Sequence, residues 1–170
     1  MRNRIVTMVV VSAVALAAVG LASARSSGVV ASAQGIYGFS GEAAGSFFVI
    51  HPFRWHVNVR EDDTARGHFR YTQVRDGVRL DLSGSLHCAT IIGNRVWVGG
   101  VIEESSRDTL IGLDMWFQAQ DNGQGKNEPP DMSSTVGAGA AGAAQQYCDD
   151  HPEVLFPFLL ERGDLKVRSE

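Results

Sequence analysis

The sequence predicts an all-β protein, a single antiparallel barrel-like or sandwich domain of about seven to nine strands with a short helix near Cys148. Three observations support this fold class. Short apolar runs alternate with polar residues at a period of two, turn residues recur about every eight to twelve positions, and the connections between residues 53 and 120 are short. The chain has 170 residues, which suits one domain.

The first residues have the composition of a bacterial export signal. Arg2 and Arg4 precede an uncharged apolar run over residues 5–21, and Ala22-Ser23-Ala24 is a small-residue cleavage pattern. We therefore expect residues 1–24 to be a signal peptide that is cleaved after Ala24. Cleavage after Ala33, or retention of the segment as a membrane anchor, are the alternatives.

Residues 25–40 carry mostly small side chains and are predicted to be a flexible leader, which leaves residues 41–170 as the single β-domain. The first clear strand covers residues 53–60, where apolar and polar side chains alternate. Further strands are expected at residues 68–72, 78–88, 91–92, 96–102, 110–120, 154–160 and 165–167. Within residues 78–88, Leu82, Leu86 and Cys88 share one face, so Cys88 is expected to point inward.

The two cysteines, Cys88 and Cys148, are the only cysteines in the chain. An even number of cysteines in an exported protein indicates a disulfide. A bridge over a span of this length would stabilise the fold by about 4 kcal/mol in the loop-closure model. Two free thiols are the alternative.

The charge of the chain bears on its partners. Without Arg2 and Arg4, it has 13 basic and 19 acidic residues, a net charge of −6. Binding to nucleic acid or to an anionic membrane needs clustered Lys and Arg, so neither is expected. No integral membrane segment is expected after signal cleavage. We expect a secreted or periplasmic protein, whose partner is an extracellular or envelope protein or a small molecule.

The segment from Asp121 to Asp131 contains oxygen-bearing side chains of the type that calcium prefers. Candidate ligands for a calcium ion are Asp121, Asn122, Asn127, Glu128 and Asp131. The spacing differs from that of an EF-hand loop. A structural loop whose Asp and Asn side chains cap its own turns is the alternative, and no other cofactor is expected.

Three strand aromatics are candidates for ligand binding: Trp116, Phe53 and Trp55. Trp116 is out of phase with the apolar residues of its strand, and an indole on the polar side could stack on a sugar. Packing within the core is the alternative for Phe53 and Trp55, and packing within the core or against a partner strand is the alternative for Trp116. If the protein has a site, we expect it where the segment around Cys148 covers the sheet.

Catalytic groupings are weak in this sequence. The histidines of the strands lack the spacing of a metalloprotease, and adjacent carboxylates such as Asp62-Asp63 would point to opposite faces. The sequence thus favours a non-catalytic binding domain and gives no catalytic residue. The alternatives are a small-molecule-binding barrel, as in an isomerase or cyclase, and a calcium-dependent adhesive module.

The order of motifs resembles that of a group of small secreted bacterial proteins that have no assigned activity. The motifs are Cys88, Gly93-Asn94, Gly99-Gly100, Asp121-Asn122-Gly123-Gln124-Gly125, Pro129-Pro130-Asp131 and Tyr147-Cys148. The resemblance covers about residues 41–167. It implies secretion and a β-fold and agrees with a disulfide, but it carries over no catalytic or binding residue.

Overall fold

The computed structural model describes residues 28–43, 45–124, 127–153 and 158–169. These residues form an antiparallel sheet curled into a half-barrel, with one short α-helix, so the predicted fold class is confirmed. The proposed signal peptide lies outside the described residues. In the described part of the chain, no helix has the length and the apolar character needed to span a bilayer.

The described residues contribute ten strands to the sheet. The strands are β1 (Val29–Ala43), β2 (Ser46–Arg60), β3 (Ala65–Arg75), β4 (Val78–Ile92), β5 (Arg95–Ser105), β6 (Asp114–Gln120), β7 (Met132–Ser133), β8 (Gly137–Gly139), β9 (Phe158–Leu159) and β10 (Arg162–Ser169). Their order is β10-β1-β2-β3-β4-β5-β6-β7-β9, and β8 pairs with β6 beside this path. The helix α1 covers Ala143–Asp150, and a 3₁₀ turn covers Asp108–Leu110.

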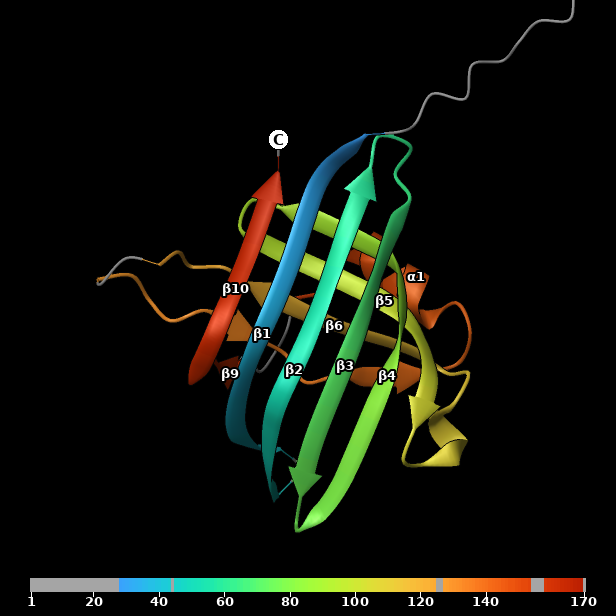
Figure 1. The fold of residues 1–170 in the computed structure, drawn as a ribbon, viewed down its shortest axis with the longest axis vertical. Coiled ribbons are helices and arrows are strands. Elements are labelled where there is room, and N and C mark those ends of the chain that lie inside the picture. Colours follow the sequence, from blue (N-terminus) through green and yellow to red (C-terminus); the bar gives the residue numbers. More distant parts are fainter. Residues whose placement is uncertain (1–27, 44, 125–126, 154–157, 170) are drawn as a thin grey trace, which may run out of the picture.

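The curled sheet encloses an aromatic core. Strands β10, β1, β2 and β3 run side by side with the first part of β4, while β5 and β6 cross behind them (Figure 1). Phe117 of β6 contacts both Phe53 and Trp55 of β2, with ring centroids 4.7 and 5.0 Å apart. As predicted, alternate residues of β2 face this core, and the residues between them face solvent.

The prediction of a flexible leader is wrong from Val29 onward, because this segment forms β1. Strand β1 pairs with β2 on one side and with β10 on the other. Its small residues fit beneath large neighbours: a Cβ atom on Gly35 would lie 2.5 Å from the Tyr37 ring and 2.9 Å from Trp55 Nε1. The neighbours supply the apolar bulk that the segment itself lacks, so low bulk does not prevent a strand here.

Cys88 faces the opposite side of the sheet from Leu82 and Leu86, contrary to the prediction. The pairing of β4 with β5 shifts register between Leu86 and Cys88, as at a β-bulge. An extra residue in one strand reverses the faces of the residues that follow. Leu86 therefore lies in the main core, whereas Cys88 packs with Ala144 and Cys148 in a second cluster beneath α1.

The two edges of the curled sheet approach each other at the link between β9 and β10. The backbone N–H of Leu160 donates to the carbonyl of Asp131, next to β7, at 2.9 Å. The N–H of Glu161 donates to the carbonyl of Gly38 in β1 at 3.0 Å. The consecutive residues Leu160 and Glu161 thus connect opposite edges of the half-barrel.

Candidate functional site

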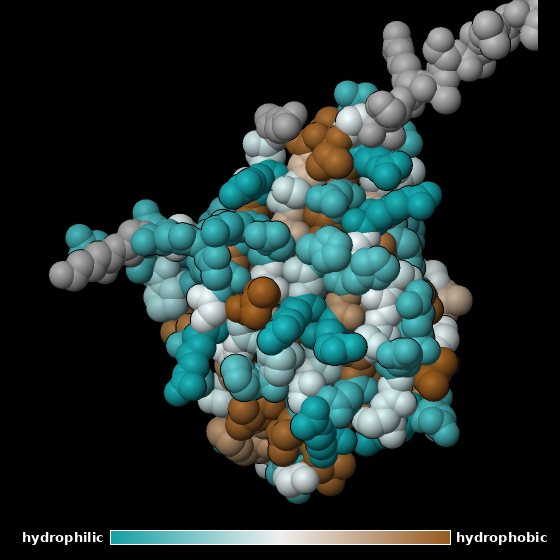
Figure 2. Space-filling view, viewed as in Figure 1, coloured by the Kyte–Doolittle hydropathy of each residue, from teal (hydrophilic) through white to brown (hydrophobic). Residues whose placement is uncertain are grey.

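A groove of about 640 Å³ lies on the outward face of the sheet, and strands β1–β5 and β10 line it. Its polar lining includes Gln34, Arg54, His56, His68, Arg70, Ser83, Glu103, Glu104 and Asp164. A volume of this size is in the range of sites that hold small organic molecules. Figure 2 views the molecule from the side of β1–β4, and hydrophilic side chains cover the middle of that face.

Strand register assembles the middle of the groove. Arg54 of β2 pairs directly with Arg70 of β3, and His56 pairs directly with His68. The imidazole centroids are 5.7 Å apart. Because side chains two residues apart on a strand share a face, these two pairs form adjacent rungs that project outward.

The charge of this centre is not neutralised by close partners. Among the described residues, the side chain of Arg54 makes no hydrogen bond and no ion pair. Arg70 forms no salt bridge there either, although its charge contributes to lowering the pKa of Asp81. The main causes of that lowered pKa are the hydrogen bonds from Arg79 and Thr72.

Acidic residues flank Arg54 and Arg70, the basic centre of the groove, on both sides. The strand pairings align one row across the sheet: Asp164, Ile36, Arg54, Arg70, Ser83 and Glu104. On the β5 side, the Ser83 hydroxyl donates to Glu104 Oε2 at 2.8 Å. On the β10 side, Asp164 pairs with Lys166 at 2.9 Å and accepts a hydrogen bond from Gln124.

The middle of the groove holds two histidines beside the two arginines. Four described histidines lie in strands, His51, His56, His68 and His87, and among these the rings of His56 and His68 are in contact. In the ranges that the structure covers, no three His, Cys, Asp or Glu side chains converge to hold a metal ion. The arrangement offers hydrogen-bond donors and positive charge, which suit binding of an anion.

Of the three aromatic candidates for ligand binding, Phe53 and Trp55 share the core face of β2, whereas Trp116 lies on β6 outside that core cluster. Trp55 lines the groove, but its side chain is 4% exposed, and its Nε1 donates to Tyr37 Oη at 3.0 Å in the interior. Phe53 is fully buried in the core. Their role in ligand binding stays a prediction, and the groove offers them little contact.

Trp116 packs under a segment of small residues. A Cβ atom on Gly137 would lie 2.5 Å from the indole, and one on Gly139 would lie 3.0 Å from it. The Tyr147 ring of α1 lies 6.0 Å away, and burial raises the pKa of Tyr147 to about 12. The glycines of β8 therefore allow this neighbouring strand to cover Trp116 closely. This is the packing against a partner strand that was the alternative to ligand binding.

The carboxylates of the proposed calcium loop bond to the protein backbone. Asp121 accepts from the N–H of Gly123 through Oδ1 and from the N–H of Val167 through Oδ2, both at 2.9 Å. Asp131 Oδ1 accepts from the N–H of Asn122 at 2.8 Å. The bonds from Gly123 and Asn122 are those of a loop that caps its own turns, and the bond from Val167 ties the loop to β10. Of the remaining candidates, Glu128 lies beside Gly123 and Asn127 is exposed.

The pKa of Asp131 is raised above its ordinary value. Burial is the main cause, and the negative charges of Asp121 and Asp164 add to it. The hydrogen bond from the N–H of Asn122 acts in the opposite direction. The fold therefore brings Asp164 of β10 near the loop residues Asp121 and Asp131, at a cost in electrostatic free energy.

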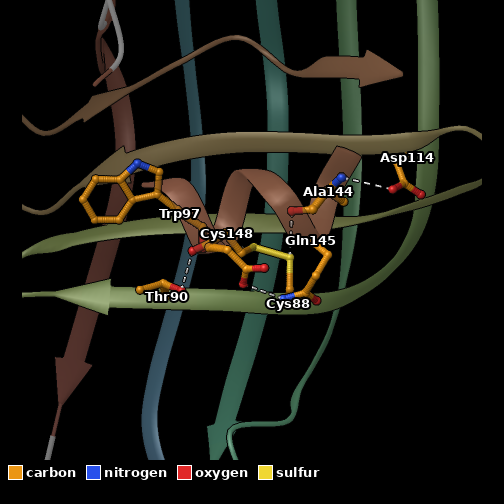
Figure 3. The surroundings of a disulfide bond; sticks show 8 residues. Cys88, Thr90, Trp97, Asp114, Ala144, Gln145 and Cys148 are labelled. Atoms are coloured by element: carbon orange, nitrogen blue, oxygen red, sulfur yellow. Dashed lines mark hydrogen bonds between the residues drawn. A yellow bond between two sulfur atoms is a disulfide. The ribbon is translucent and has the colours of Figure 1, made fainter. Parts of the chain in front are cut away.

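The predicted disulfide between Cys88 and Cys148 is present and ties α1 to the sheet (Figure 3). The Thr90 hydroxyl donates to the Cys148 carbonyl at 2.9 Å, and the Ala144 N–H donates to Asp114 Oδ2 at 3.0 Å. A Cβ atom on Gly99 would lie 2.6 Å from Cys88 Sγ. The helix thus packs tightly on β4, β5 and β6.

The sequence predicts a site where this cover meets the sheet, and a small pocket of the described residues lies near it. That pocket has about 80 Å³ and is lined by residues such as Arg95, Gln118 and Glu153. Its volume suits a few water molecules rather than an organic ligand. The outward groove is a better candidate site by size and by charge.

Sequence reasoning did not single out Arg54 and Arg70. The alternation of residues 53–60 places Arg54 outward, but only the register of the β2–β3 hairpin places Arg70 opposite it. The polar turn between these strands leaves that register open at the level of sequence.

Comparison with protein-family models, with curated proteins and with solved structures finds no match to this chain.

Proposed function

We propose that this protein is an exported, non-catalytic binding domain that holds a small molecule in the outward groove. The observation that carries the proposal is the groove of about 640 Å³ with Arg54 and Arg70 at its centre. Like charges directly opposite each other on neighbouring strands destabilise a sheet. A bound group of opposite charge would offset this cost, so the arrangement favours a ligand.

Export is supported by the composition of residues 1–24 and by the disulfide, since disulfides persist mainly outside the cytoplasm. Cleavage after Ala24 is the better of the two alternatives. Cleavage after Ala33 would remove part of β1, including Ala33 itself, which is 2% exposed and pairs with Val57 and Val167.

A ligand inside the half-barrel has less support. The interior positions that would line such a site are occupied by rings in mutual contact, among them Phe53, Tyr71 and Phe117. The buried tyrosine hydroxyls also have partners: Tyr37 Oη lies 2.9 Å from Ser133 Oγ, and Tyr71 is bonded to the backbone at Val136. The groove remains open to solvent, whereas this interior is filled.

The test is native mass spectrometry of the protein purified from its host with the disulfide intact. The wild type is expected to carry a small molecule, and Ser83→Trp is expected to lose it because the indole fills the groove. Asn58→Trp is the matched control, since Asn58 is exposed on the outward face of β2 and does not line the groove. Retention of the same molecule by Ser83→Trp would overturn the proposal.

A further inference from the structure

We infer that the ligand carries a compact oxyanion, a carboxylate or phosphate group, that binds between Arg54 and Arg70, and that protons on His56 and His68 tighten its binding. The inference rests on the proposed function, since it names the ligand class of the same groove and a control on its affinity.

The geometry of the centre fits one compact anion. Two guanidinium groups on directly opposite residues can approach the same group from two strands, and each offers several N–H donors. Arg recognises carboxylate and phosphate oxygens in a bidentate manner. Ser83 lies next to Arg70 across β3 and β4, so its hydroxyl lies at the same rung.

The flanks of the groove select against a long polyanion. Glu103 and Glu104 line it at β5, and Asp164 lines it at β10. A nucleic acid or a polyanionic chain that crossed the groove would bring its charges against these carboxylates. A single anionic group held at the centre avoids them, and hydroxyl or amino groups on the rest of the ligand would complement them.

The histidine pair makes the affinity depend on protons. Imidazole gains a proton between about pH 5 and pH 8, and each proton adds a positive charge one rung from the arginine pair. An anion bound at Arg54 and Arg70 therefore favours the protonated histidines, and by linkage protonation favours the anion. Affinity must rise as pH falls.

The other charged groups near the histidines do not reverse this sign. On their own strands, His56 and His68 are flanked by Arg54, Arg70 and Arg66. Gln34 of β1 lies opposite His56, and Lys166 of β10 lies opposite Gln34. On the β4 side, Ser85 lies opposite His68, and the acidic groups Glu103, Glu104 and Asp164 stand at the rim. A bound anion would add its negative charge closer to the imidazoles than these carboxylates.

The test uses sulfate and oxalate, which both keep two negative charges between about pH 5.5 and pH 8, so that only the protein titrates. Sulfate represents a phosphate group, and oxalate represents carboxylates. Calorimetry at constant ionic strength measures the dissociation constants, and backbone amide NMR shifts locate the site. We expect at least one of the two anions to perturb the amides of residues 54–56 and 68–70.

The expected affinity gain between pH 8 and pH 5.5 is about tenfold, as two added charges at this range would give. Arg54→Gln is expected to weaken binding by about tenfold or more at both pH values. Arg66→Gln is the matched control on β3 and is expected to leave binding unchanged, because Arg66 does not line the groove. The double variant His56→Asn/His68→Asn should bind the anion at pH 8 as the wild type does, and should show no increase in affinity at pH 5.5.

Three results separate this inference from the proposed function. Equal affinity of the wild type at both pH values would overturn the role of the histidines. Binding that Arg54→Gln leaves unchanged, or no binding of either anion, would overturn the anion site. In each of these cases, a host ligand that Ser83→Trp expels would still support the groove as a binding site.

Discussion

Arg54 and Arg70 stand directly opposite each other on β2 and β3, although both carry positive charge. Their neighbours on the same strands, His56 and His68, also face each other. Close like charges raise the free energy of the folded state, and such costs are concentrated at sites that bind ligands.

Removing one charge of this pair is expected to stabilise the protein in the absence of ligand. We expect Arg54→Gln to raise the free energy of unfolding by about 0.2–1 kcal/mol at low salt, and by less at high salt. Urea denaturation at two salt concentrations measures the effect. Arg66→Gln is the control, because Arg66 lies opposite the uncharged Asn58. A loss of stability in Arg54→Gln would show that the pair does not cost free energy.

Loss of the disulfide is expected to release α1 before the rest of the fold. The bridge spans 60 residues, and the double variant Cys88→Ala/Cys148→Ala should lose about 2–4 kcal/mol of unfolding free energy. Hydrogen exchange should show faster exchange in α1, while β1–β3 stay protected because their ladders do not depend on the bridge. Unchanged protection of α1 would contradict this.

The raised pKa of Asp131 predicts an effect of pH on stability. The folded state binds the proton more tightly than the unfolded state, so the unfavourable contribution appears as pH rises through the folded pKa and vanishes below the unfolded pKa. Asp131→Asn removes the charge and keeps an acceptor for the Asn122 N–H. We expect it to raise the melting temperature at neutral pH and to change it little under acid conditions.

The variant Asp131→Asn also tests whether the loop binds calcium. Because the oxygens of Asp121 and Asp131 already accept backbone hydrogen bonds, we expect calcium to leave the melting temperature of the wild type unchanged. A melting temperature that rises with calcium in the wild type, but not in Asp131→Asn, would establish the calcium-dependent alternative instead.

The position of β1 predicts where the proposed signal peptide is cleaved. Strand β1 begins at Val29, and Ala33 is buried between β2 and β10. We expect N-terminal sequencing of the exported protein to begin at Arg25. A terminus at Gln34 would place the cleavage inside the strand, and the truncated chain would then be expected to melt at a lower temperature.

Much of the fold could be predicted from local alternation. The faces of Phe53 and Arg54 follow from a period of two, and so does the polar face that becomes the groove. The strand over residues 29–43 could not be predicted this way, because its burial comes from rings on other residues, such as Trp55. The face of Cys88 depends on a register shift that leaves no periodic trace.

The candidate site was harder to predict than the fold. In the sequence pattern, each residue of the basic centre looks like an ordinary solvent-facing residue of its own strand. Only the pairing of Arg54 with Arg70, and the curvature that brings Glu104 and Asp164 to the same groove, gives them a shared environment. These relations join six strands, β1–β5 and β10, and lie beyond any local pattern.

The hydrogen bond from Val167 to Asp121 has a consequence for the behaviour of the protein in crowded surroundings. Strand β10 ends the sheet, and the free N–H and C=O groups of a terminal strand are a template on which other chains can add. Asp121 occupies the N–H of Val167, and Gln124 binds Asp164 farther along the same strand. The loop after β6 thus occupies one edge N–H of β10 and contacts its side chains, and we expect it to hinder the addition of another strand there.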